Sequence, residues 1–150
     1  MVERRELLEL FYNIQRKMKK EWMKQLKPGI NPSQFLILKN LKHFGAQKAN
    51  ELAEAIQMTP GAITGASDKL VSEGYAERKG AKGDRRVVYL EITDKGDQLM
   101  NSMTENQKKV TETFFEGLSD EDINHLIRIY HQISVNLDRQ APPVQTNKNL

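Results

Sequence analysis

Apolar residues recur at steps of three and four near both ends of the chain, which is the pattern of an amphipathic helix. The N-terminal set, within residues 3–26, consists of Leu7, Phe11, Ile14, Met18 and Trp22. The C-terminal set consists of Ile123, Leu126, Ile127, Tyr130, Ile133 and Leu137. A third apolar stripe consists of Leu99, Met103, Val110 and Phe114. The spacing predicts three long helices over 3–26, 94–116 and about 120–139.

Start and stop signals predict three shorter helices between the long ones. Asn31-Pro32-Ser33-Gln34 combines a capping residue, a proline suited to the first helical position, and a glutamine that can reach back to the cap. Thr59-Pro60 repeats this signal, and Ser119 followed by three acidic residues is another helix start. Gly74 stands where a left-handed C-terminal cap is usual. We expect short helices over 32–44, 48–56 and 60–72.

After Gly74 the apolar pattern changes from helical to alternating. Val88, Leu90 and Ile92 alternate with more polar neighbours, as in a half-buried strand. Residues 75–79 suit an antiparallel partner, and 80–84, with two glycines, would be the tip of the hairpin. Prolines and polar residues predict a loose tail over 140–150. The predicted fold class is therefore mostly α with a small antiparallel β-hairpin.

Composition narrows the class of protein. A chain of 150 residues with 38% apolar and 29% charged residues has room for one compact domain, or one with a helical extension. The absence of cysteine excludes disulfides and thiol chemistry. The apolar runs are too short to cross a membrane, and the N-terminus has no signal-peptide block. We expect a soluble cytoplasmic protein with no membrane partner.

Basic residues concentrate where the hairpin is predicted. The formal net charge is only +3, but residues 78–86 contain five basic residues and one acid, Asp84. Two short helices followed by a basic hairpin are the parts of a winged helix-turn-helix. The second helix of such a pair fits the DNA major groove, and a basic hairpin is attracted into a minor groove. The pattern therefore favours double-stranded DNA as a partner.

The predicted recognition helix over 60–72 divides into two faces. Its apolar side carries Ile63, Ala66, Leu70 and Val71. The residues expected to approach DNA at its start and along its other side are Thr59, Pro60, Gly61, Thr64, Gly65, Asp68 and Lys69. The hairpin and phosphate contacts are expected from Lys48, Arg78, Lys79, Lys82, Asp84, Arg85 and Arg86. The alternative for this helix is an ordinary amphipathic surface helix without a ligand.

Several short motifs in this region resemble the MarR family of bacterial regulators. They are Lys48-Ala49-Asn50-Glu51-Leu52-Ala53, Ala62-Ile63-Thr64, Asp68-Lys69-Leu70, Gly74-Tyr75-Ala76-Glu77-Arg78, Asp84-Arg85-Arg86 and Leu90-Glu91-Ile92-Thr93-Asp94-Lys95-Gly96. The Asp-Arg-Arg motif followed at this spacing by Thr-x-x-Gly is the most specific of them. One position departs from the pattern, because many members carry an arginine where this chain has Gly65.

The resemblance implies a homodimeric regulator, most often a repressor. Residues 1–30 and 97–139 would form a helical dimerisation region, and 31–96 the winged helix-turn-helix. Two recognition helices would enter successive major grooves of a pseudo-palindromic operator, about one helical turn (~34 Å) apart. Asp84 would orient Arg85 or Arg86, one of which would enter the minor groove. Gly65 weakens the expectation of base contacts from that position and costs the helix about 1 kcal/mol relative to alanine.

The family often binds small aromatic or amphipathic effectors between its dimerisation helices and its DNA-binding lobe. Residues that could line such a pocket here are Phe11, Tyr12, Met18, Trp22, Met23, Phe35, Met100 and Met103. The alternative is that these side chains fill the core and the dimer interface.

Metal and enzyme chemistry are not expected. His125 and His131 lie six residues apart, roughly 240° around a helix, and His43 is distant in sequence. There is no glycine-rich phosphate loop, activated nucleophile or paired carboxylate in an apolar setting. We therefore expect no cofactor. The competing hypothesis for function is a winged-helix module that binds another protein through its recognition face.

Overall fold

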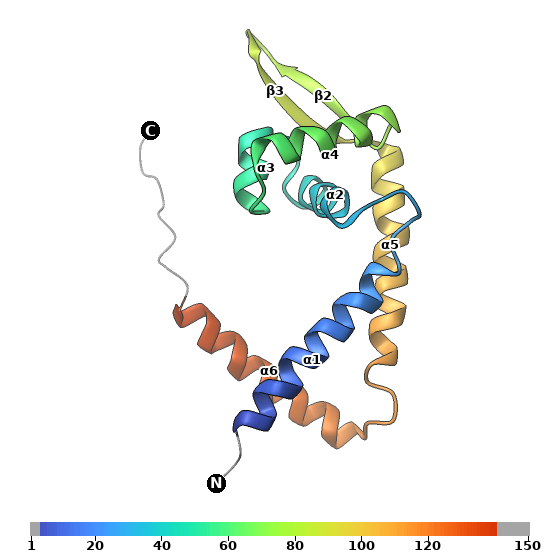
Figure 1. Cartoon of the computed structure of the whole chain (residues 1–150), viewed down its shortest axis with the longest axis vertical. Coiled ribbons are helices and arrows are strands. Elements are labelled where there is room, and N and C mark those ends of the chain that lie inside the picture. The colour runs from blue at the N-terminus through green and yellow to red at the C-terminus, as the bar shows by residue number, and fades with distance from the viewer. Residues whose placement is uncertain (1–3, 141–150) are drawn as a thin grey trace. The chain divides into compact units, whose positions relative to one another are not determined.

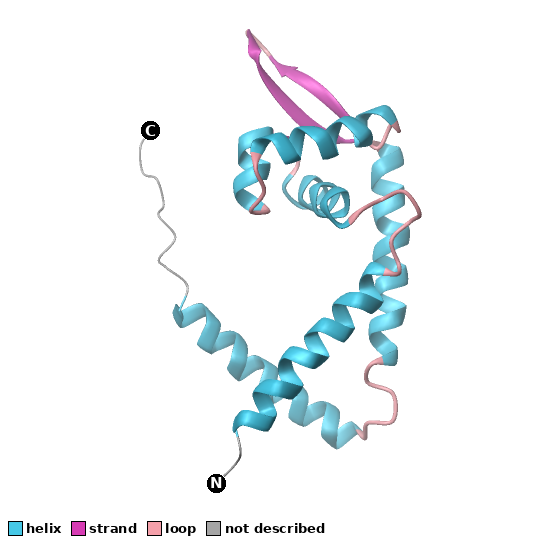
Figure 2. Cartoon of the chain, in the orientation of Figure 1, coloured by secondary structure: helices cyan, strands magenta, loops and turns pink. Residues whose placement is uncertain are grey.

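The computed structural model describes residues 4–140, except for the side chain of Arg85. Within these residues the elements are α1 (Arg4–Met23), α2 (Pro32–Phe44), β1 (Gln47–Lys48), α3 (Ala49–Ala55), α4 (Pro60–Ser72), β2 (Ala76–Ala81), β3 (Asp84–Ile92), α5 (Asp94–Thr113) and α6 (Asp120–Gln140) (Figure 1). The predicted mostly helical fold with a β-hairpin is confirmed (Figure 2). Residues 141–150 of the predicted tail lie outside the described part. None of the described helices is long and apolar enough to span a membrane.

Local capping explains where three of the helices begin. The Asn31 side chain accepts a hydrogen bond from the Gln34 amide (2.8 Å), and the Gln34 side chain accepts one from the Asn31 amide (3.0 Å). Thr59 accepts one from the Ala62 amide at the start of α4 (3.2 Å). Ser119 and Asp122 form a reciprocal pair at the start of α6. Each pair satisfies amides that the first helical turn leaves without a partner.

The sheet differs from the prediction in two ways. The hairpin tip is shorter than 80–84, because β2 extends to Ala81 and β3 begins at Asp84. Only Lys82 and Gly83 form the turn, where Gly83 has a φ of +90°, and an irregularity between Gly80 and Ala81 precedes it. In addition, the two-residue strand β1 pairs with β3, which gives the order β1-β3-β2. A strand this short has no alternating pattern to detect.

The long helices also end earlier than their apolar stripes suggested. α1 ends at Met23 and α5 at Thr113, where we expected about residue 26 and residue 116. In both cases the last apolar residues continue into a turn, so periodicity alone overestimated the helix length.

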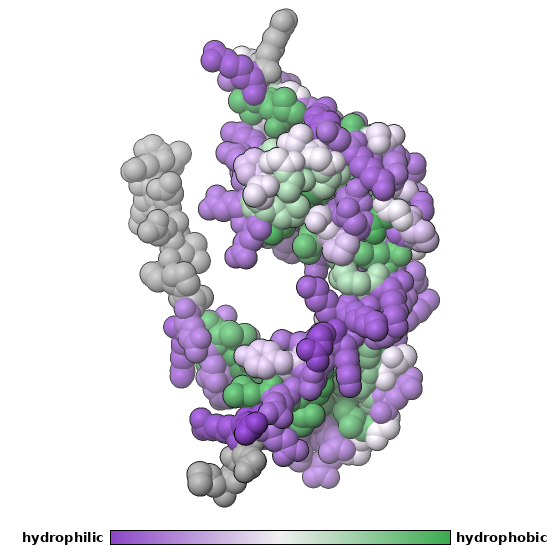
Figure 3. All heavy atoms as spheres, viewed as in Figure 1, coloured by the Kyte–Doolittle hydropathy of each residue, from purple (hydrophilic) through white to green (hydrophobic). Residues whose placement is uncertain are grey.

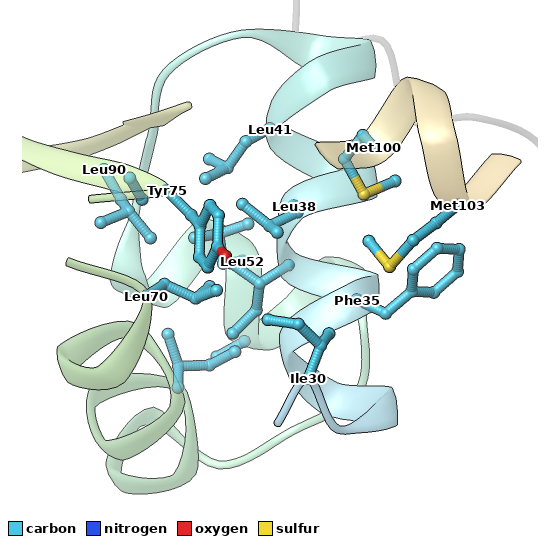
Figure 4. Close-up of a cluster of buried hydrophobic side chains, with 14 residues drawn as sticks. Ile30, Phe35, Leu38, Leu41, Leu52, Leu70, Tyr75, Leu90, Met100 and Met103 are labelled. Atoms are coloured by element: carbon cyan, nitrogen blue, oxygen red, sulfur yellow. The ribbon is translucent and has the colours of Figure 1, made fainter. Parts of the chain in front are cut away.

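One apolar core joins α2, α3, α4, the sheet and α5. Its side chains include Phe35, Leu38, Leu41, Leu52, Leu70, Tyr75, Leu90, Met100 and Met103. Figure 4 shows Met100 and Met103 reaching into this cluster from α5. This core holds α4, the predicted recognition helix, against α2, α3 and β2.

The chain divides into two compact units, residues 1–111 and 112–150. The first contains α1, the core described above and most of α5. The second contains the end of α5 and α6, and its helix α6 has no buried residue. Apolar residues of α6 are visible on the surface in Figure 3.

Candidate nucleic-acid interface

The recognition helix α4 presents short side chains to solvent. Gly61, Thr64, Gly65 and Asp68 are exposed, whereas Ile63 and Leu70 are buried and Ala66 and Val71 are half-buried, as the sequence predicted. The Thr64 hydroxyl donates a hydrogen bond to the Pro60 carbonyl (3.0 Å). A Cβ atom at Gly65 would meet no atom within 4 Å. The exposed face is therefore open enough for another surface to approach the backbone closely.

Ser67 is the residue of α4 that sequence analysis did not place. It is buried, and its hydroxyl oxygen has no hydrogen-bond partner among the described residues. A serine on the inner side of the helix carries no hydrophobic signal, so periodicity could not identify it.

Two of the basic residues predicted to contact DNA, Arg78 and Lys79, form ion pairs with acidic side chains. Arg78 Nη2 lies 2.5 Å from Asp68 Oδ1, which ties β2 to the exposed face of α4. Lys79 Nζ lies 2.7 Å from Glu91 Oε2 and 3.2 Å from Glu77 Oε1. These hydrogen bonds, first to Glu91 and then to Glu77, raise the pKa of Lys79. The acids offset much of the positive charge at the base of the hairpin.

Positive charge at the tip of the hairpin is more open. Lys82 is exposed in the turn, and the side chain of Arg86 is 96% exposed. Asp84 Oδ1 accepts a hydrogen bond from the Arg86 amide (2.9 Å) and lies 3.9 Å from Arg86 Nε. Asp84 therefore faces Arg86 without enclosing it. Arg85 belongs to β3, but its side chain lies outside the described part of the structure.

Two further predicted lysines have partners of a different kind. Lys48 Nζ, on β1, lies 5.7 Å from the centre of the ring of Tyr89, its register partner on β3. Lys69 Nζ donates a hydrogen bond to the carbonyl oxygen of Gly29 (2.8 Å), in the segment that joins α1 and α2. Sequence analysis assigned Lys69 only to DNA and missed this contact, because residues 29 and 69 are brought together by the tertiary fold.

The Thr-x-x-Gly motif forms the corner between the hairpin and α5. The Thr93 hydroxyl donates a hydrogen bond to the Gly74 carbonyl (2.6 Å) and accepts one from the Gly96 amide (3.1 Å). A Cβ atom at Gly96 would lie 2.0 Å from the Tyr75 carbonyl oxygen, so the close approach requires glycine. The motif fastens α5 to the chain that leaves the recognition helix.

A cavity of about 560 Å³ lies between α1, α2 and α5. Among the residues predicted for an effector pocket, Trp22, Met23 and Phe35 line it. Three lysines also line it, Lys19, Lys39 and Lys108, and none of its lining residues is acidic. Trp22 Nε1 donates a hydrogen bond to Thr111 Oγ1 (2.7 Å), and Gln107 Nε2 donates one to the Trp22 carbonyl (3.3 Å). These contacts link α1 to α5 beside the cavity.

The other residues predicted for this pocket lie elsewhere. Met100 and Met103 are buried in the core. Phe11 and Tyr12 are exposed on α1, with their ring centres 5.5 Å apart. Met18 is half-buried and does not line the cavity. Among the described residues, no group of three or more histidine, aspartate and glutamate side chains could hold a metal ion.

Sequence comparison relates the chain to bacterial transcriptional regulators. A model of the MarR family matches residues 30–88. The chain is 32% identical over 117 residues to the HTH-type transcriptional repressor MdtR of Bacillus subtilis, covering 78% of this chain and 74% of that protein. It is 30% identical over 110 residues to the regulator MhqR of the same organism, covering 73% and 76%.

Structural comparison gives the same fold. The YusO protein of Bacillus subtilis matches with a TM-score of 0.76 and 25% identity, over 89% of this chain and 98% of that one. A mutant of MepR from S. aureus, bound to an oligodeoxyribonucleotide, matches with a TM-score of 0.69 and 21% identity, over 87% and 97%.

Proposed function

Because this chain belongs to the MarR family of HTH-type transcriptional regulators, we propose that it is a homodimeric repressor whose operator binding is controlled by a small molecule. Membership of this family makes the protein a DNA-binding transcriptional regulator and not an enzyme. We propose, in addition, that it forms a dimer, that specific residues contact an operator, and that an effector controls this binding. A regulator of this kind acts where the chromosome lies, so a cytoplasmic location is part of the proposal.

The open positive charge at the hairpin tip carries the DNA part of the proposal. Arg86 is exposed and faces Asp84, while Lys82 occupies the turn. An arginine held beside an acid in this way is suited to the narrow, negative minor groove. Lys48, on the short strand β1, would contact a DNA phosphate. Arg85 would contact the minor groove together with Arg86.

The recognition helix would enter the major groove through its small exposed face. This face includes Thr59, Pro60, Gly61, Thr64 and Gly65, with Asp68 beside them in its ion pair with Arg78. Arg78 and Lys79 would reach phosphate only by exchanging their carboxylate partners for it, and Lys69 by giving up the Gly29 carbonyl. We therefore expect the tip of the hairpin to contribute more to affinity than its base.

Exposed apolar faces on α1 and α6 support the homodimer. Neither helix has a buried residue among those described. Residues 1–30 and 97–139 would bury these faces against a second copy, while 31–96 read the DNA. A dimer with two recognition helices would match a pseudo-palindromic operator with half-sites about one turn (~34 Å) apart.

The cavity between α1, α2 and α5 supports control by an effector. Its volume of about 560 Å³ is within the range of small-molecule pockets. Trp22, Met23 and Phe35 offer an apolar wall, and three lysines offer positive charge without an acid among the lining residues. The proposed effector is a small aromatic or amphipathic molecule with an anionic group. Binding that favours one spacing of the recognition helices would shift the dimer away from the operator.

Titration of the protein with duplex DNA from its own promoter region tests the DNA part. We expect a steep decrease of affinity with salt and a preference over unrelated duplex. The double substitution Arg85→Ala with Arg86→Ala should weaken operator binding by about 10- to 100-fold and reduce the salt slope by about 1 to 2. The matched control is Arg128→Ala, which removes one exposed charge from α6 and should leave affinity unchanged.

Unchanged affinity in the double variant would contradict the assignment of the hairpin. Weak binding that does not vary with salt or sequence would contradict operator binding and favour the alternative, a winged-helix module that binds a protein. The small exposed face of α4, without a long basic side chain at Gly65, is the observation that keeps this alternative in view.

A further inference from the structure

The C-terminal end of the recognition helix is fastened to the segment that joins α1 and α2. Lys27 Nζ donates a hydrogen bond to the hydroxyl of Tyr75 (2.7 Å) and lies 5.4 Å from the centre of its ring. Lys69 Nζ, on α4, donates one to the carbonyl of Gly29 (2.8 Å). The two bonds run in opposite directions between the same two segments. Movement of residues 24–29 would therefore pull on the end of α4.

The same segment begins at the wall of the cavity. Trp22 and Met23, the last residues of α1, line the cavity, and Trp22 is hydrogen-bonded to Thr111 and Gln107 of α5. Only three residues separate Met23 from Lys27. A molecule that displaces Trp22 would thus act on the segment that carries Lys27.

Tyr75 also receives contacts from the start of α5, the helix whose residues from Thr104 to Thr111 line the cavity. It is buried, with 4% of its surface exposed, directly after the turn that ends α4. Lys95 Nζ, on α5, lies 4.8 Å from the centre of its ring, and the Thr93 amide donates to its carbonyl (3.1 Å). Both α1 and α5 therefore lead from the cavity to one residue at the end of the recognition helix.

The acceptors in this junction are a phenol and a backbone carbonyl rather than carboxylates, so the bonds act mainly through their geometry. Lys27 donates to a phenol and Lys69 to a backbone carbonyl. The hydrogen bond to Tyr75 is the largest cause of a raised pKa at Lys27. The donor is therefore a full ammonium group at neutral pH.

We propose that Lys27 is a positioning residue which, through the Tyr75 hydroxyl, couples the cavity between α1, α2 and α5 to the recognition helix. This inference rests on the proposed binding of operator DNA. Coupling of binding sites is reciprocal, so DNA bound to α4 must also change the surroundings of the cavity. Trp22 is the single tryptophan of the chain, and its emission reports on the cavity directly.

The test follows two signals while the full-length protein is titrated against labelled operator duplex. Anisotropy of the label measures DNA binding, and tryptophan emission measures the change at Trp22. For the wild-type protein, we expect an emission change that saturates together with the anisotropy. Lys27→Met and Tyr75→Phe each remove the hydrogen bond, and the second does so without changing charge. Both should lose most of the emission change while operator affinity falls by no more than about tenfold.

Two matched variants separate coupling from general damage. Lys27→Arg keeps a donor at this position and should restore the emission change. Tyr130→Phe removes a hydroxyl from an exposed tyrosine of α6 and should leave both signals unchanged.

Failure of the coupling and failure of DNA binding give different results in this experiment. DNA binding without an emission change in the wild-type protein would overturn the coupling, and so would an equal change in Lys27→Met and Tyr75→Phe. If anisotropy shows no binding of operator DNA, the proposed function itself fails, and the inference that depends on it fails with it.

Discussion

The winged-helix lobe (residues 31–96) and the end helices α1 and α6 differ in how far their apolar side chains are buried. In the lobe, Ile37, Leu38, Leu52 and Leu70 are completely covered by other parts of the same chain. In α1 and α6, which have 20 and 21 residues, no residue is buried. The lobe therefore buries its own apolar side chains, whereas each end helix keeps apolar side chains exposed to solvent in a single copy of the chain.

Each of the two end helices exposes six large apolar side chains. On α1 the exposed apolar side chains are Leu7, Leu8, Leu10, Phe11, Tyr12 and Ile14. On α6 they are Ile127, Ile129, Tyr130, Ile133, Val135 and Leu137. Apolar area removed from water contributes about 25 cal/mol per Å², and contiguous exposed patches mark interaction sites. Folding of the lobe and the proposed assembly through the end helices should therefore respond to different substitutions.

The largest effect is expected in the lobe, from Gly96→Ala. Its new Cβ atom would lie 2.0 Å from the Tyr75 carbonyl oxygen, so the corner between the hairpin and α5 must move. Overpacking against backbone should lower the free energy of unfolding by about 3 kcal/mol or more. Urea unfolding followed by circular dichroism measures this loss.

Gly65→Ala is the matched control for that substitution. It adds the same methyl group on the exposed face of α4, where no atom lies within 4 Å. It should stabilise the protein by about 0.5 to 1 kcal/mol. Equal effects of the two alanines would show that the corner at Gly96 is not tightly packed.

The next largest effect is expected at the end helices, from Ile133→Glu on the apolar face of α6. A carboxylate buried without a partner in the proposed dimer interface should weaken association by about 2 kcal/mol or more. Sedimentation measures the shift from dimer to monomer, while thermal unfolding of the lobe should remain nearly unchanged. Gln132→Glu, about 100° around the helix from Ile133, places the same carboxylate where an exposed polar side chain already stands and serves as the control. A dimer that survives Ile133→Glu would show that the exposed apolar residues of α6 do not form the dimer interface.

The smallest effect concerns the start of α6 and its response to acid. Hydrogen bonds from Ser119, first from its hydroxyl and then from its amide, lower the pKa of Asp122. A carboxyl with a lowered pKa in the folded state stabilises above its unfolded pKa of about 3.9. This stabilisation is lost as pH falls through the folded value.

Asp122→Asn should therefore reduce the acid sensitivity of α6, seen as a flatter dependence of Tm on pH below about 4. Ser119→Ala removes the donor hydroxyl but keeps the amide donor, so it should give a smaller part of the same flattening. An Asp122→Asn protein as acid-sensitive as wild type would assign the acid response to other groups.

Local signals explain which parts of the fold could be predicted. The pairs Asn31 with Gln34 and Ser119 with Asp122 are encoded within four residues, and both form as expected. The alternation at Val88, Leu90 and Ile92 likewise predicted the strand β3, although only Leu90 is buried, Ile92 is half-buried and Val88 is exposed. The family resemblance added what local signals lack, the use of these elements for binding DNA.

Features that depend on distant residues could not be predicted in the same way. The strand Gln47–Lys48 exists because β3 offers it a partner. Periodicity placed Met103 and Trp22 on apolar stripes, but it could not tell that Met103 enters the core and Trp22 lines a cavity. The partner of Lys69, the carbonyl of Gly29, is a backbone atom and leaves no trace in the side-chain pattern.

The empty space around Gly65 gives the recognition helix room to diverge. No neighbouring atom would meet a side chain added there, and the position does not need a positive φ. Glycine and arginine codons differ by a single nucleotide, so one mutation can install a long basic side chain on this face without repacking the core. If α4 reads DNA as proposed, such a substitution would add a base contact while the fold around it stays unchanged.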